Sequence, residues 1–278
     1  MKHIYLNLKR FDIPVALGGV NNLSDMRYWG GEIVRQTQEA LMRHDRNEVE
    51  FVQFFPEAHI LGAVAALREN SPVQIGSQSV YRMDTSPGGN FGAFTSNRTA
   101  KSVLAMGCTY TLIGHCEERT DKLGILSEAG NPCAKTVNRL LNAQVRLALD
   151  AGLKVLYCVG EKSEEQDRSS DVIREQIETG LDGVDLAKVV IAYEPVWAIG
   201  PGKTPPDKAY IENMARLIKE VTGGADVVYG GGLKADNAKM LAGIKEIDGG
   251  LIALTRFTGE IGFYPEEYLE IIDTYLAN

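Results

Sequence analysis

The sequence predicts an α/β protein in which eight parallel strands and their connecting helices close into a (β/α)8 barrel. Short runs that are apolar throughout alternate with amphipathic segments, as expected of parallel strands covered by helices on both faces. Eight such runs in 278 residues suit the length of this barrel. No Pro- or Ser-rich linker interrupts residues 1–278, so we expect a single domain. Periodicity alone leaves an open, doubly wound sheet as the alternative.

The expected strands are rich in Val, Ile, Leu, Tyr and Phe, which suit buried strands. In chain order they are residues 3–8, 49–54, 72–77, 109–114, 154–159, 188–193, 226–230 and 249–254. Apolar residues at helical spacing predict helices over 26–44, 57–70, 137–152, 207–221, 235–243 and 266–277. Two connections, 10–25 and 77–99, are longer than a bare barrel needs.

Composition narrows the class of protein. The formal net charge of −8 and the sequence pI near 5.2 disfavour nucleic acid and anionic membranes as partners. No apolar run approaches the roughly 20 residues of a membrane span, and the N-terminus has no signal-peptide core. The four cysteines show neither a C-x-x-C pair nor metal spacing. We therefore expect a cytoplasmic protein with free thiols and no metal.

Candidate catalytic groups lie where the expected strands end, because the carboxyl ends of barrel strands meet on one face. Lys9 follows the first strand, His115 the fourth and Glu194 the sixth. Gly-rich turns follow the seventh and eighth strands and can offer backbone N–H groups to an anion. A carboxylate, a histidine and a lysine suit an aldose–ketose isomerisation, in which a proton leaves carbon next to a carbonyl and an enediolate forms. This chemistry needs no cofactor.

Each of these residues also has a structural interpretation. Lys9 could be a solvated lysine, and His115 could be a hydrogen-bonded structural histidine. Glu117 could favour a helix start through the dipole, and Glu161, after the fifth strand, could be a surface or capping charge. For Glu194 a structural role is less favoured, because Pro195 and a Gly-rich loop follow it and leave no helix to cap.

Several motifs, in chain order, resemble the triosephosphate isomerase family. "YEPVWAIGPGK" (193–203) resembles its flexible lid, although Thr is more usual at Pro201. "LIGHCEER" (112–119) resembles its Gly-His-Ser-Glu-Arg-Arg segment, and "CVGE" (158–161) and "NLK" (7–9) match strand-end motifs. "GAFTS" (92–96) resembles its dimer loop. "YGGG" (229–232) and "DGGLIALTRF" (248–257) stand where its two phosphate turns belong.

The resemblance implies a TIM barrel that interconverts dihydroxyacetone phosphate and glyceraldehyde 3-phosphate in glycolysis and gluconeogenesis, without a cofactor. It implies a homodimer formed through the 77–99 loop. It also implies roles for individual residues: Glu194 as base, His115 as neutral electrophile, Asn7 and Lys9 as substrate-binding and electrostatic groups, Glu117 as a buried carboxylate behind them, and Gly200 as a lid N–H for the phosphate.

The chain departs from the family pattern mainly at the phosphate end. Gly232 replaces a serine, and Ala253-Leu254 replaces the Gly-Gly pair whose N–H groups face the phosphate. Pro205 replaces an alanine, so with Gly232 it removes two hydrogen bonds that hold the closed lid. We expect these turns still to bind substrate and Arg256 to take over the phosphate. The alternative for Arg256 is a solvated arginine or one paired with a carboxylate.

Two further changes concern the subunit contact. Glu118 replaces an arginine, and Asn97 stands where the family tends to have the glutamate that pairs with it across subunits. The departures leave two alternative functions open. One is isomerisation of another sugar phosphate, such as a tetrulose phosphate, and the other is a binding barrel without catalysis. Retention of Asn7, Lys9, His115, Glu117 and Glu194 argues against the latter.

Overall fold

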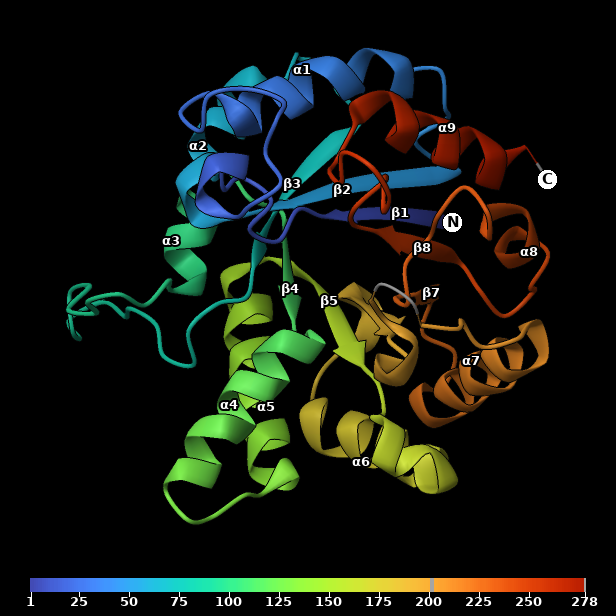
Figure 1. Ribbon diagram of the computed structural model, residues 1–278. Helices are drawn as coiled ribbons and strands as arrows, with labels where there is room; N and C mark the ends of the chain where they lie inside the picture. The colour runs from blue at the N-terminus through green and yellow to red at the C-terminus, as the bar shows by residue number, and fades with distance from the viewer. Residues whose placement is uncertain (201–202, 278) are drawn as a thin grey trace.

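The structure is a computed structural model that describes residues 1–200 and 203–277. Its strands form one closed barrel in chain order, and β1 pairs with β8 in parallel (Figure 1). This closure confirms the predicted TIM barrel and rules out the open sheet. The strands are β1 (Lys2–Asn7), β2 (Val49–Phe55), β3 (Val73–Gln78), β4 (Tyr110–Ile113), β5 (Lys154–Val159), β6 (Val189–Tyr193), β7 (Val227–Tyr229) and β8 (Gly249–Ile252).

Helices surround the strands in Figure 1, and every predicted helix is present. They are α1 (Trp29–Leu41), α2 (Glu57–Ala66), α3 (Ala100–Ala105), α4 (Cys116–Glu128), α5 (Ala134–Ala151), α6 (Ser169–Gly180), α7 (Lys208–Thr222), α8 (Ala238–Ala242) and α9 (Pro265–Leu276). Short 3₁₀ turns are η1 (Val15–Leu17), η2 (Ser163–Arg168), η3 (Leu186–Lys188) and η4 (Val196–Ala198). None of the described helices is long and apolar enough to cross a membrane.

Three helices are not among those predicted from periodicity. α3 has only six residues, too few for a repeating apolar stripe. α4 buries no residue completely, so it lacks the stripe that marks an amphipathic helix. α6 buries Val172, Ile173 and Ile177 but is otherwise polar. The sequence signal for a helix therefore failed where little apolar surface is buried.

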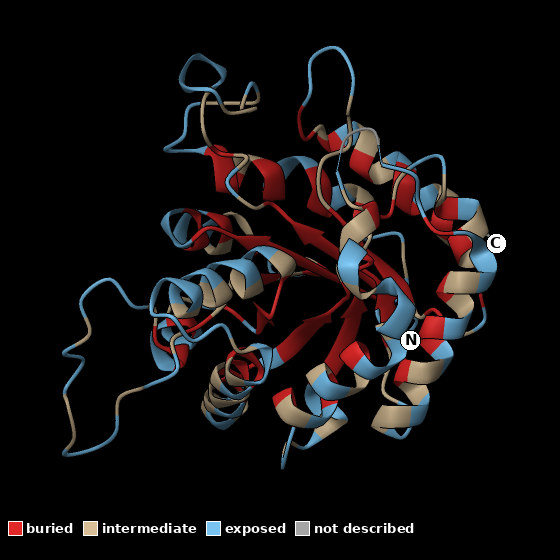
Figure 2. Ribbon diagram, turned by 60° about the horizontal axis from the view of Figure 1, so that its bottom comes forward, coloured by how far each residue is buried: buried red, intermediate tan, exposed pale blue. Residues whose placement is uncertain are grey.

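The core has two layers, and Figure 2 shows the buried strands at the centre with exposed outer helix faces. Alternate strand residues, such as Tyr5, Phe54, Leu156 and Leu251, fill the barrel interior. The intervening residues pack against the helices and form the larger cluster. This packing holds the strand ends in place, and so positions the groups that follow them.

The 77–99 loop extends away from the barrel (Figures 1 and 2). Its base is closed by a hydrogen bond from the Tyr81 N–H to the Arg98 carbonyl at 2.6 Å. The rings of Tyr81 and Phe94 also pack edge to face. Phe91, toward its tip, is 86% exposed. An ordered loop thus presents an apolar ring to its surroundings.

Candidate active site

A cavity of about 280 Å³ opens where the strands end. Strand-end residues and the Gly-rich turns form its walls, as the sequence predicted. Of the predicted site residues, Asn7, Lys9, His115, Glu117, Glu194, Gly200, Gly232, Ala253 and Leu254 line it. Arg256 is not among the lining residues.

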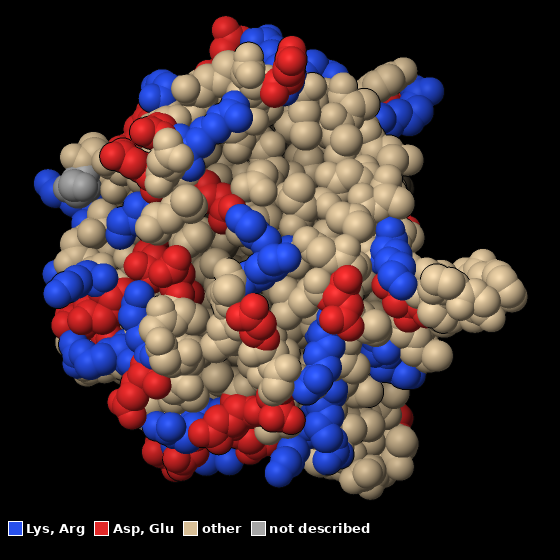
Figure 3. Space-filling view, turned by 180° about the vertical axis from the view of Figure 1, so that it is seen from behind, with Lys and Arg blue, Asp and Glu red and all other residues tan. Residues whose placement is uncertain are grey.

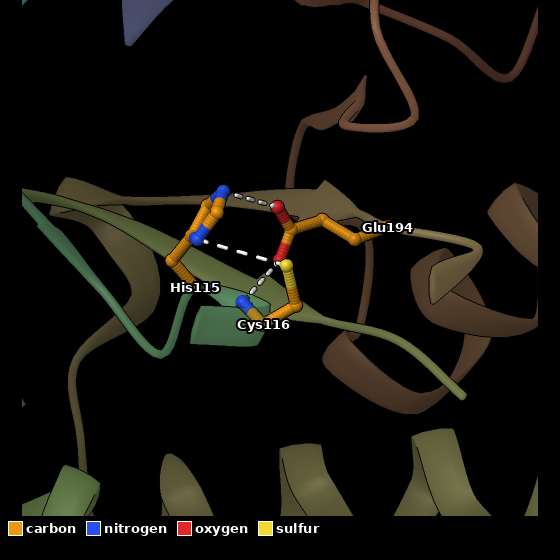
Figure 4. A group of neighbouring side chains, drawn as sticks. All are labelled: His115, Cys116 and Glu194. Carbon is orange, nitrogen blue, oxygen red and sulfur yellow. Dashed lines mark hydrogen bonds and ion pairs between the residues drawn. The ribbon is translucent and has the colours of Figure 1, made fainter. Parts of the chain in front are cut away.

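Glu194 follows directly after β6 and is 1% exposed. Its Oε2 accepts a hydrogen bond from the Cys116 N–H at 3.0 Å, and its Oε1 lies 3.1 Å from Nε2 of His115 (Figure 4). Oε1 accepts no well-aligned hydrogen bond from any described residue. Burial raises the pKa of Glu194, although the electrostatic interactions with His115 and Lys9 oppose this. A buried carboxylate with one free oxygen and a raised pKa suits a general base.

His115 caps the N-terminus of α4. Its Nδ1 accepts the Glu117 N–H at 3.3 Å, so in the neutral ring this hydrogen-bond network assigns the proton to Nε2. Figure 4 shows the ring of His115 and the carboxylate of Glu194 facing each other from β4 and β6. The Nε2–H can therefore donate toward a carbonyl oxygen in the cavity.

Asn7 is the last residue of β1, and Lys9 follows two residues later. Lys9 has φ +39°, in the left-handed region that non-glycine residues seldom adopt. The Asn7 side chain accepts the Lys9 N–H at 3.1 Å, and Gln78 donates to the Lys9 carbonyl at 3.0 Å. These bonds hold a strained backbone, which is common where a side chain must be aimed at a site.

Glu117 differs from the expectation of a buried carboxylate. Its side chain is 65% exposed at the cavity mouth and accepts a hydrogen bond from the Lys9 Nζ at 2.7 Å. Partial burial raises its pKa, but the Lys9 hydrogen bond and charge outweigh this and leave the pKa lowered. Glu117 is the second residue of α4, and the helix end directs it toward solvent and Lys9 rather than into the core.

Glu161 has a more central place than a surface or capping charge. It is fully buried, and its Oε1 accepts hydrogen bonds from the Tyr193 hydroxyl at 2.9 Å, the Trp197 Nε1–H at 2.7 Å and the Tyr210 hydroxyl at 3.0 Å. The lid segment comprises residues 195–205, and these donors come from β6 before it, from η4 near its start and from α7 after it. Glu161 thus joins both ends of the lid segment to β5. Of this segment, Pro201 and Gly202 lie outside the described residues.

The structure does not bring Arg256 to the phosphate end of the cavity. Its Nε donates to Glu267 Oε1 at 2.8 Å, and its guanidinium lies 3.7 Å from the centre of the Tyr264 ring. Glu267 belongs to α9, outside the barrel mouth. The paired-arginine alternative therefore describes its place, and the expected takeover of the phosphate by Arg256 is not supported. Lys234, which the sequence interpretation passed over, lines the cavity instead.

His115, Cys116 and Glu194 offer donor atoms within 4.8 Å of one another, close enough to share a cation. Burial raises the pKa of the Cys116 thiol to about 12, so it stays protonated near neutral pH. A protonated thiol is a poor metal ligand. The residues fit proton transfer better than metal binding.

Glu118 pairs with residues of its own chain. Its carboxylate accepts the Gly114 N–H at 2.8 Å and the Ser79 hydroxyl at 2.6 Å, and it pairs with Lys122 at 3.2 Å. Ser79 lies at the start of the 77–99 loop, so Glu118 connects this loop to the N-terminus of α4. The glutamate that replaces the family's arginine thus has its partners inside the subunit.

Known proteins resemble this chain over most of its length. A family model described as triosephosphate isomerase matches residues 29–272. The triosephosphate isomerase of Parasynechococcus marenigrum is 37% identical over 201 residues, which cover 71% of this chain and 75% of that protein. That of Syntrophotalea carbinolica is 33% identical over 225 residues, 76% of this chain and 80% of the other.

A solved structure agrees with the fold. The crystal structure of triosephosphate isomerase from Bartonella henselae matches with a TM-score of 0.73 and 24% identity, covering 99% of this chain and 98% of that one. At this sequence identity the match shows that the two chains share the barrel fold and no more, whereas the family model and the sequence relatives show family membership. On that evidence, the chain belongs to the triosephosphate isomerase family.

Proposed function

We propose that this isomerase interconverts dihydroxyacetone phosphate and glyceraldehyde 3-phosphate through an enediolate. The observation that carries the proposal is the placement of Glu194 Oε1 and His115 Nε2, 3.1 Å apart, on the wall of one cavity. A proton acceptor and a proton donor at this separation can act on a carbon and on the carbonyl oxygen bound to its neighbour.

In the proposed reaction, Glu194 takes a proton from the carbon beside the carbonyl. The electron pair left on carbon forms the C=C bond of the enediolate, and the carbonyl oxygen becomes negative. The His115 Nε2–H and the Lys9 ammonium stabilise that oxygen. The proton of the hydroxyl group on the deprotonated carbon then passes to the former carbonyl oxygen, so that the negative charge moves to the other oxygen. Glu194 returns its proton to the neighbouring carbon, the C=C electron pair forms the new C–H bond, and the negative oxygen forms the new C=O bond, so that no electrons or atoms are gained or lost.

A coupled assay with both triose phosphates tests the proposal. Glu194→Gln keeps the size of the side chain and removes the basic oxygen, so we expect turnover to fall by about 10²–10⁴-fold or more. Glu164→Gln, an exposed glutamate of η2, is the matched control and should leave turnover unchanged. Wild-type turnover in the Glu194 variant would remove Glu194 from the mechanism.

The same assay should include tetrose and tetrulose phosphates. Gly232, Ala253 and Leu254 all line the cavity, so the departures from the family pattern lie where a substrate would bind. Preference for a four-carbon substrate by kcat/KM would replace the triose assignment while keeping the chemistry.

We also propose that the protein is a homodimer through the 77–99 loop. Residues 85–97 contain no charged side chain, and the protruding arm in Figure 3 is correspondingly uncharged. Exposed Phe91 and Met83 suit burial against a second copy. Sedimentation at micromolar concentration should give a dimer, and Phe91→Asp should shift it toward monomer; a wild-type monomer would contradict the proposal.

The four free cysteines support a reducing, cytoplasmic location.

A further inference from the structure

Lys234 lies in the turn between β7 and α8, on the side of the cavity formed by the altered phosphate turns. The turn holds it firmly from both sides. Its N–H donates to the Asn237 side chain at 2.8 Å, and Asn237 in turn donates to the Gly232 carbonyl at 2.9 Å. The preceding Leu233 is fully buried and donates to the Leu251 carbonyl at 2.9 Å. The backbone that carries Lys234 is thus fixed to β8.

The side chain of Lys234 folds back over Gly232. A Cβ added at Gly232 would lie 3.3 Å from the Cε of Lys234, a close contact that would require the lysine to shift. The family pattern has a serine at this position. The absence of a side chain at Gly232 therefore leaves space for the lysine stem beside the place where a Cβ would otherwise stand.

The ammonium of Lys234 rests 4.2 Å from the centre of the Phe257 ring, which also lines the cavity. Such a contact holds a cation in place without neutralising it. Lys9, the other lysine of the lining, is paired with Glu117 at 2.7 Å. Among the described residues, Lys234 has no carboxylate at ion-pair distance. Its charge therefore remains available to a ligand.

We propose that Lys234 binds the phosphate of the substrate and does so in place of the serine hydroxyl and glycine N–H groups that the family pattern has at Gly232, Ala253 and Leu254. The proposal rests on the proposed function, since it assigns the anionic end of the same site. Leu254, Phe257 and Ile261 give this part of the lining an apolar surface, beside which the attraction between the cation and a dianionic phosphate ester is less screened than in bulk water. Lys234 is thus the residue that selects phosphorylated over uncharged sugars.

Two measurements on the full chain test this. Lys234→Met should raise KM for the triose phosphate by about 10- to 100-fold, because it removes one charge-assisted hydrogen bond. It should change kcat by less than about threefold. It should also weaken the binding of inorganic phosphate, measured by calorimetry, by about tenfold. Lys239→Met, an exposed lysine of α8, is the matched control and should match the wild type. Phe257→Leu, which keeps an apolar side chain, should weaken phosphate binding about threefold.

The calorimetric arm separates this inference from the proposed function. If no sugar phosphate is isomerised but Lys234→Met still loses phosphate affinity, the function fails and the role of Lys234 stands. If the Lys234 variant binds inorganic phosphate within about twofold of the wild type, the inference is overturned, whatever the enzyme activity. Lys234→Arg should retain most of the affinity, and a loss equal to that of the Met variant would also contradict the role of the charge.

Discussion

Glu161→Gln should destabilise the protein and loosen the lid segment. The substitution keeps the shape of the side chain and leaves an oxygen where Oε1 accepts bonds from Tyr193, Trp197 and Tyr210. What it removes is the negative charge. Tyr193 precedes residues 195–205, Trp197 lies near the start of this segment and Tyr210 follows it, so weaker bonds at Glu161 reach both ends of the segment at once.

The magnitude follows from those three bonds. A hydrogen bond to a charged acceptor contributes about 1 kcal/mol more than a neutral one. The neutral amide is also easier to bury than a carboxylate, which offsets part of the loss. We therefore expect the free energy of unfolding to fall by about 2 kcal/mol, and kcat/KM to fall about tenfold because the lid ends are less well held.

Urea unfolding followed by tryptophan fluorescence measures this loss. Trp197 donates directly to Glu161, so its emission also reports on the local change. Glu164→Gln, three residues further along and exposed, is the control and should stay within about 0.5 kcal/mol of the wild type. A loss below about 0.5 kcal/mol in the Glu161 variant, with normal kcat/KM, would refute the anchoring role.

Three further outcomes are expected. Burial raises the pKa of Glu194, which the proposed mechanism requires in its ionised form. As the pH decreases, kcat/KM should therefore fall with an apparent pKa above the roughly 4.3 of a free glutamate. An acid limb with an apparent pKa below that value would contradict this. Burial raises the pKa of Glu50, but hydrogen bonds from His3, Tyr110 and Lys154 outweigh burial and leave the pKa well below its ordinary value. The stabilisation by this carboxylate is therefore complete above about pH 5 and declines as the pH falls. Glu50→Gln should therefore cost about 3 kcal/mol at pH 7 and flatten the acid side of the stability curve in urea titrations; equal stability at pH 7 would count against it. Nitrogen-15 NMR of His115 should show the proton on Nε2, and a proton on Nδ1 would disprove the cap assigned from the Glu117 N–H.

The sequence by itself determined the barrel and the convergence of Glu194 and His115 on one face of it. Eight apolar runs became eight strands because parallel strands covered on both faces must be apolar throughout, a pattern visible without any contact. Glu194 and His115 were found because barrel strands all end on one face, so position along the chain predicts convergence. The helices with little buried surface were not predicted, because their sequences carry no comparable apolar pattern.

Only the tertiary structure decided which partner each charged side chain meets. Glu117 meets Lys9 from 108 residues away, and Arg256 meets Glu267 on α9 instead of a phosphate. Lys234 reaches the cavity because Gly232 leaves room for its stem and Phe257 lies beneath its ammonium. Strand periodicity is a local property of the chain, whereas the partner of a long charged side chain depends on which distant surfaces closure of the barrel brings within a few ångströms.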